Sequence, residues 1–180
     1  MIVIKIYSGL NINELIFLGE GTQGKVYKID SKKCIKIFKS KKICTAELYT
    51  LVMGQRDEHF PILYEYGNRY IIREYIDGIE LDKYLSFNPL TPDISNKLIE
   101  LYEAMEKVGY SRLDSALFHI FLTPSEDIRL IDTARAMVKE STYPKLILSG
   151  LNDLGYRDEF LNHVKVFNPK LYNDWINHHK

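Results

Sequence analysis

Hydrophobic and polar residues alternate along the first 75 positions, in the pattern of short β-strands. Apolar side chains recur at about every second position in six runs, at 2–7, 13–21, 24–30, 33–39, 62–68 and 69–75. A period of two is typical of strands that bury one face. The Gly67–Asn68 pair supplies a turn between the last two runs. This part of the chain therefore predicts a twisted antiparallel sheet.

The spacing of apolar residues changes to that of a helix at two clear places. Residues 40–54 have Ser40 as a possible N-cap, and residues 91–109 have Thr91 or Asp93. Serine, threonine and aspartate suit this position because their side chains accept hydrogen bonds from backbone amides of the first turn. We therefore expect one helix within the strand-rich part and a longer helix after it.

The remainder of the chain is mostly helical in pattern. Two short β-runs, 119–123 and 128–132, enclose a polar turn, and residues 143–180 predict two or three short helices. A β-rich part with one helix, followed by a largely helical part, is typical of an α+β fold. The length of 180 residues suits one domain.

Composition excludes several classes of protein. The chain has 24 Lys and Arg against 24 Asp and Glu, so a nucleic-acid-coating or membrane-surface protein is not expected. The two cysteines, Cys34 and Cys44, form no C-x-x-C pair and predict neither a disulfide framework nor a zinc site. No run approaches the ~20 apolar residues of a transmembrane helix. We expect a cytoplasmic protein.

The segment "GEGTQGKVY" contains Gly19, Gly21 and Gly24 at G-x-G-x-x-G spacing, with Val26 behind them. Glycines allow backbone amides to approach phosphate oxygens closely. In a dinucleotide-binding fold such a loop opens a helix, whereas here it opens a predicted strand. A glycine loop between two strands resembles that of the protein-kinase-like superfamily. The alternative is an ordinary glycine-rich hairpin.

Two charged residues extend this resemblance. Lys36 in "CIKIF" corresponds to the lysine that contacts the α- and β-phosphates of ATP, and Glu47 corresponds to the helix glutamate that pairs with it. Glu47 shares the apolar face of its helix with Ile43 and Leu51. The alternatives are a strand lysine that points outward and a surface glutamate.

The segment "IIREYIDGIELDKYL" resembles the hinge of the same superfamily. Strand character ends at Glu74 and Tyr75, and Gly78 allows a bend before a short helix. The resemblance implies that the backbone at Glu74 and Tyr75 binds the adenine.

The spacing in the C-terminal part matches the superfamily's catalytic segment. Asp114 is followed five positions later by His119, and the hairpin "HIFLTPSEDIRLID" ends at Asp132. The resemblance makes Asp114 the carboxylate that orients the attacking hydroxyl and Asp132 the metal ligand on the ATP phosphates. The alternative for Asp114 is a turn or helix-cap aspartate.

Several positions depart from the superfamily's pattern. His119 replaces an asparagine that binds metal, and Ala116 replaces a lysine often found beside the catalytic aspartate. An imidazole suits Mn²⁺ better than Mg²⁺, which prefers oxygen ligands. The metal-binding role of His119 is therefore open, and the transferring phosphoryl group has one cation fewer.

The resemblance implies a minimal two-lobed protein-kinase-like fold, with an antiparallel N-lobe at 1–75 and a truncated helical C-lobe at 76–180. It is similar to compact, atypical bacterial serine/threonine kinase-like proteins. The implied activity is transfer of the γ-phosphate of ATP, with Mg²⁺ or Mn²⁺, to a hydroxyl of a protein or small molecule. The alternative is a pseudokinase that binds nucleotide and a protein partner without transfer.

Overall fold

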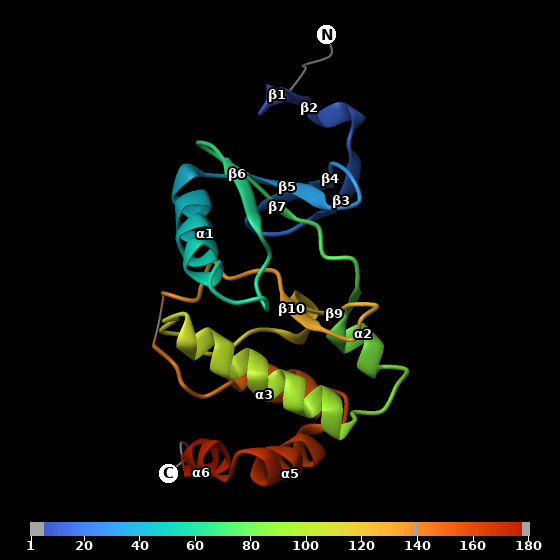
Figure 1. The fold of residues 1–180 in the computed structure, drawn as a ribbon, viewed down its shortest axis with the longest axis vertical. Coiled ribbons are helices and arrows are strands. Elements are labelled where there is room, and N and C mark those ends of the chain that lie inside the picture. The colour runs from blue at the N-terminus through green and yellow to red at the C-terminus, as the bar shows by residue number, and fades with distance from the viewer. Residues whose placement is uncertain (1–5, 139, 178–180) are drawn as a thin grey trace.

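The computed structural model describes residues 6–138 and 140–177 and has an α+β architecture (Figure 1). An antiparallel sheet with one helix forms the N-terminal part, and the other five α-helices of the described residues lie in the C-terminal part. A small second sheet lies between the large sheet and helix α3 in the view of Figure 1. The predicted α+β class is confirmed.

The large sheet contains five strands in the order β3-β4-β5-β7-β6, and every neighbouring pair is antiparallel. Its strands are β3 (Ile16–Glu20), β4 (Gly24–Lys28), β5 (Lys33–Phe38), β6 (Leu63–Tyr66) and β7 (Tyr70–Glu74). These five strands were predicted. The strand predicted at 13–21 begins only at Ile16, because residues 12–14 form a 3₁₀ turn capped by the side chain of Asn11.

The first residues form a separate small ribbon. Strand β1 (Ile6–Tyr7) pairs with β2 (Leu10–Asn11). Positions 2–5 of the strand predicted at 2–7 lie outside the described residues. Residues after this ribbon cover one face of the large sheet, where Ile12 packs with Ile35 and Ile72.

Helix α1 (Lys41–Gly54) covers the opposite face of the large sheet. It begins as predicted at Ser40, whose hydroxyl accepts a hydrogen bond from the amide of Ile43. Cys44 and Leu51 of the helix pack against Phe38 of β5, together with Ile71 of β7. This packing turns one face of α1 towards the residues of the candidate site.

The small sheet has the order β10-β9-β8, with β8 (Ile79–Glu80), β9 (Ile120–Leu122) and β10 (Ile128–Leu130). The hairpin of β9 and β10 was predicted, whereas β8 was not. Strand β8 has only two residues, and its pairing depends on Gly78, where a Cβ atom would lie 2.6 Å from the carbonyl oxygen of Leu122. Helix α2 (Leu81–Leu85) follows at once, as the predicted short helix.

The C-terminal helices enclose the main hydrophobic core. They are α3 (Pro92–Lys107), α4 (Lys145–Asp153), α5 (Arg157–Phe167) and α6 (Pro169–Asn177). Thr91, rather than Asp93, caps α3. Trp175 of α6 packs on Tyr102 of α3 and on Phe160 of α5. Within the described residues, no helix has both the length and the apolar character needed to cross a membrane.

Candidate functional site

A cavity of about 610 Å³ lies between the large sheet and the helical part. Its walls come from the β3–β4 hairpin, from β5 and β7, from the loop before β9, from the segment after β10 and from the start of α4. Of the predicted site residues, those that line it are Gly19, Gly21, Gly24, Val26, Lys36, Asp114, His119 and Asp132. The fold therefore brings most of the predicted set together from distant parts of the sequence.

Lys36 lies at the centre of the charged residues in this cavity. Its ammonium nitrogen Nζ is 2.5 Å from Oε2 of Glu47, 3.7 Å from Oδ2 of Asp132 and 3.2 Å from Oε1 of Gln23. The side chain is buried and points towards α1. The predicted Lys36–Glu47 pair is therefore present, and the outward-pointing alternative is excluded.

Glu47 supports Lys36 from behind the cavity and is not among the described residues that line it. Only 2% of Glu47 is exposed. Burial raises the pKa of Glu47, against the positive charge of Lys36. Its second oxygen, Oε1, has no hydrogen-bond partner among the described residues. A buried carboxylate is costly without a cation, so Glu47 holds Lys36 at this position.

The three glycines of the β3–β4 hairpin have different surroundings. A Cβ atom on Gly24 would lie 2.1 Å from the carbonyl oxygen of Ile37, so the close approach of β4 to β5 requires glycine there. Cβ atoms on Gly19 and Gly21 would meet no atom within 4 Å. The amide of Gly21 donates to the carbonyl of Gly24 and closes the turn. Gly19 and Gly21 therefore leave open space at the cavity.

Asp132 and His119 come from the two ends of the β9–β10 hairpin. Nε2 of His119 is 3.9 Å from Oδ2 of Asp132, and the amide of Ala134 donates to Asp132 Oδ1. Burial alone would raise the pKa of Asp132, but the charge of Lys36, and that of His119 when its imidazole is protonated, lower it on balance. Burial lowers the pKa of His119, against the charge of Asp132. Asp132 is thus held as a carboxylate and His119 as a neutral imidazole near pH 7.

No cluster of three His, Cys, Asp or Glu side chains suited to a metal ion occurs in the described part of the chain. Asp132 and His119 supply one carboxylate and one imidazole. Magnesium in phosphate-transfer sites commonly binds one or two carboxylates and completes its shell with phosphate oxygens and water. The donor set therefore fits a metal ion that arrives with a phosphate ligand.

Asp114 is bound to the start of helix α4. Its Oδ1 accepts a hydrogen bond of 2.9 Å from the amide of Leu146 and a longer one of 3.3 Å from that of Ile147. Nη2 of Arg112 is 3.4 Å from Oδ2. The Asp114 side chain is 2% exposed, and burial raises its pKa against these hydrogen bonds. The cap-aspartate alternative therefore describes the observed contacts of Asp114.

Glu74 and Tyr75, predicted to bind adenine through their backbone, are not among the described residues that line the cavity. The carbonyl of Glu74 accepts a hydrogen bond of 3.2 Å from Nη1 of Arg73, and the amide of Tyr75 donates to the carbonyl of Lys32. The Glu74 carboxylate is 2.5 Å from Arg129. The Glu74 carbonyl and the Tyr75 amide are therefore already hydrogen-bonded within the fold.

Gln23, Arg73 and Thr133 are among the residues that line the cavity but were not predicted as site residues. Gln23 places its side-chain oxygen on Lys36, and Arg73 extends from β7 into the cavity wall. Thr133 is buried and shares a 2.8 Å hydrogen bond with Thr50 of α1. The sequence gives a signal only for Arg73, which is a charged residue within the apolar strand "YIIRE".

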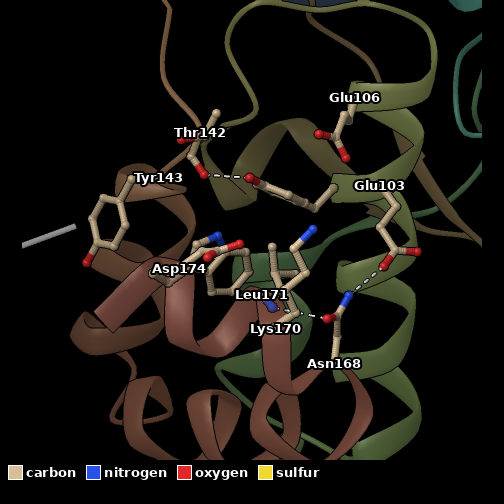
Figure 2. A pocket seen from close by; sticks show the side chains of 10 residues that line it. Glu103, Glu106, Thr142, Tyr143, Asn168, Lys170, Leu171 and Asp174 are labelled. Carbon is tan, nitrogen blue, oxygen red and sulfur yellow. Dashed lines mark hydrogen bonds between the residues drawn. The ribbon is translucent and has the colours of Figure 1, made fainter. Parts of the chain in front are cut away.

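A second, smaller cavity of about 270 Å³ lies between α3, α6 and the segment around Thr142 (Figure 2). Tyr102 donates to the carbonyl of Thr142. Asn168 donates to Glu103, as a dashed line of Figure 2 shows. These bonds attach the last helix and the 140–144 segment to α3. They account for this cavity as part of the helix packing.

No protein-family model matches the chain, and no curated protein matches its sequence. A buried lysine, an ionised carboxylate and a neutral imidazole lie beside a glycine hairpin with open space. Such a group can bind a phosphate chain together with a divalent cation.

Proposed function

We propose that this protein is a nucleotide-dependent phosphotransferase with a minimal protein-kinase-like fold. In this proposal residues 1–75 form the N-lobe, residues 76–180 form the C-lobe, and a nucleoside triphosphate binds in the 610 Å³ cavity. The observation that carries the proposal is the position of Lys36, between Glu47 and Asp132 and beside the glycine hairpin. A buried lysine held by a carboxylate is suited to bind phosphate oxygens.

Two groups of cavity residues bind the nucleotide and its metal in this proposal. Lys36 binds phosphate oxygens in place of the Gln23 side chain, which now occupies one of its donor directions. Asp132 holds Mg²⁺, and the neutral His119 makes Mn²⁺ a suitable second choice. The metal supplies neutralisation of the charge that develops on the phosphoryl group.

Asp114 is the residue proposed to orient an acceptor hydroxyl of a serine, a threonine or a small molecule. In the observed structure its carboxylate faces the amides of Leu146 and Ile147. A hydroxyl that approaches Asp114 must therefore replace at least one of these hydrogen bonds. Phosphotransfer therefore requires Asp114 to release part of its contact with the first turn of α4.

The same contact favours a second candidate function, a pseudokinase that binds nucleotide and a protein partner without phosphotransfer. Asp114 has a structural role in the observed fold, and Ala116 offers no cation to the transferring group. Neither the structural role of Asp114 nor the alanine at position 116 affects the cluster of Lys36, Glu47 and Asp132. Nucleotide binding is therefore common to both candidates, and only phosphotransfer separates them.

The first test is thermal unfolding with ATP and, separately, GTP, each in Mg²⁺ and in Mn²⁺. A nucleotide at about 100 times its dissociation constant adds about 2.7 kcal/mol, which raises Tm by about 5–10 °C for a chain of this size. We expect this shift to be lost in Lys36→Ala and Asp132→Asn. It is retained in the control Lys42→Ala, which changes an exposed lysine of α1 outside the cavity.

Radiolabel transfer from the bound triphosphate then separates the two candidates. Labelled product that depends on Asp132 supports the phosphotransferase, whereas metal-dependent binding without any product supports the pseudokinase. The absence of a shift with every nucleotide and metal would overturn both.

A further inference from the structure

Arg73 is a buried cation that the proposed phosphate chemistry does not use. It lies on β7, opposite Cys34 of β5 in the strand register, and its side chain lines the large cavity. The residue is 5% exposed. Its Nη1 donates to the carbonyl of Glu74, and its Nε has no hydrogen-bond partner among the described residues.

The acids around Arg73 do not account for its burial. Among the described residues, no carboxylate lies within 4.0 Å of the Arg73 guanidinium. Its charge opposes the burial that raises the pKa of Glu47 and contributes to the lowered pKa of Asp132. Both of these acids are paired with Lys36 instead. A guanidinium without an ion pair in such a place is costly to desolvate. A bound ligand with acceptor atoms would compensate that cost.

The position of Arg73 relative to Lys36 indicates which part of a nucleotide it would meet. Lys36 and Cys34 are two residues apart on β5, so their side chains share one face of the sheet, and Arg73 pairs with Cys34. Val26 of β4 and Leu130 of β10 also line this cavity and are apolar. With the phosphates at Lys36, a flat base between Val26 and Leu130 places its edge towards Arg73.

We propose that Arg73 makes this site prefer a purine with a carbonyl at position 6, that is, a guanine nucleotide over ATP. This inference rests on the proposed nucleotide-dependent function and names the base that it uses. Guanine presents two acceptors, O6 and N7, which match the donors of a guanidinium. Adenine presents its 6-amino donor at the same edge, opposite another donor. Arg73 also occupies the Glu74 carbonyl, which would otherwise accept from that amino group.

The test is direct titration of the wild type with Mg²⁺ complexes of GTP, inosine triphosphate and ATP. Inosine keeps O6 and N7 but lacks the 2-amino group, so it isolates the edge that faces Arg73. We expect GTP and inosine triphosphate to bind at least about tenfold more tightly than ATP, from the usual discrimination of an arginine–guanine pair. ATP binding as tight as, or tighter than, both would overturn the assignment.

Arg73→Met removes the donors and keeps most of the side-chain length. We expect this variant to lose the preference, with GTP and ATP within about threefold of each other. The control is Arg69→Met, an exposed arginine in the turn before β7 and outside the cavity, which retains the wild-type ratio. An unchanged ratio in folded Arg73→Met would also overturn the assignment.

The outcomes separate the two proposals. If ATP binds more tightly and depends on Lys36, the proposed function stands and only the role of Arg73 is wrong. If no nucleotide binds, both proposals are wrong. The wild-type titration gives a decision even if Arg73→Met does not fold.

Discussion

Replacement of Asp114 tests whether helix α4 depends on a residue 31 positions before its first residue, Lys145. Helix α4 has no side-chain cap at Pro144, the residue that precedes it. Its first amides instead donate to Asp114, which lies in a different segment of the chain. Asp114→Ala removes these acceptors and leaves the amides of Leu146 and Ile147 without them. We therefore expect the variant to lose stability whether or not Asp114 has a catalytic role.

The magnitude follows from the kind of bond that is lost. Loss of a helix cap costs roughly 0.5–2 kcal/mol, and hydrogen bonds to charged groups contribute about 1.5–3 kcal/mol. Burial of the Asp114 carboxylate, which raises its pKa, offsets part of this contribution. We expect a loss of about 2 kcal/mol for Asp114→Ala, equivalent to a decrease in Tm of about 4–8 °C. Asp114→Asn keeps one carbonyl oxygen for Leu146 and should lose about half as much.

The assay is thermal and urea unfolding of both variants beside two controls. Thr91→Ala removes the local cap of α3, where one hydroxyl accepts from the amide of Ile94, and should cost about 1 kcal/mol. Asp158→Ala removes a highly exposed carboxylate of α5 and should change stability by less than about 0.5 kcal/mol. An Asp114→Ala protein with the Tm of the wild type would show that the contact with α4 contributes nothing.

Three further changes test other parts of the structure. Lys36→Met should destabilise the fold by about 3–5 kcal/mol in urea unfolding, because it leaves the Glu47 carboxylate buried without its cation. The double variant with Glu47→Gln should recover much of this stability, and no recovery would refute the explanation by the lost ion pair. Gly24→Ala should lower Tm strongly because its Cβ atom would meet the backbone of β5, whereas Gly21→Ala, which has open space, should change stability by less than about 1 kcal/mol. The pKa of Asp57 is lowered because its hydrogen bonds with His59 and Lys107 outweigh its burial. The stabilisation by Asp57 is therefore complete above the ordinary aspartate pKa of about 3.9 and is lost as the pH falls through the lower pKa of the folded state. The difference in free energy of unfolding between wild type and Asp57→Asn should shrink from about pH 6 to about pH 2, and a constant difference would contradict this.

The strand and helix pattern could be predicted from the sequence because most elements carry their own local signals. Ser40 and Thr91 cap the helices that they were expected to cap, and the alternating runs form the five strands of the large sheet. Strand β8 was missed because two residues give no periodicity, and its pairing depends on the approach of Gly78 to the backbone of Leu122. Tertiary contact decides such short elements.

The part of the candidate site that could be predicted is the pair of side chains with opposite charge. An inward lysine on a strand needs an anionic partner, and the resemblance to the protein-kinase-like superfamily named Glu47, on the apolar face of the next helix, as that partner. Contacts with the backbone could not be expected in the same way. The engagement of Asp114 by α4, and of the Glu74 carbonyl by Arg73, depends on where distant segments meet. Spacing along the chain carries no information on these partners.

The residues of the cavity differ in whether the fold itself needs them, and this difference points to the ligand. Gly24 and Asp114 have roles that the structure explains, through a close strand contact and a helix cap. Arg73 Nε and Glu47 Oε1 are a buried donor and a buried acceptor without partners among the described residues. Folded proteins rarely leave such atoms unpaired, and exceptions concentrate at functional sites. Arg73 lines the cavity of about 610 Å³, and Glu47 holds Lys36 from behind it. These two unpaired atoms are therefore stronger support for ligand binding than the glycine pattern alone.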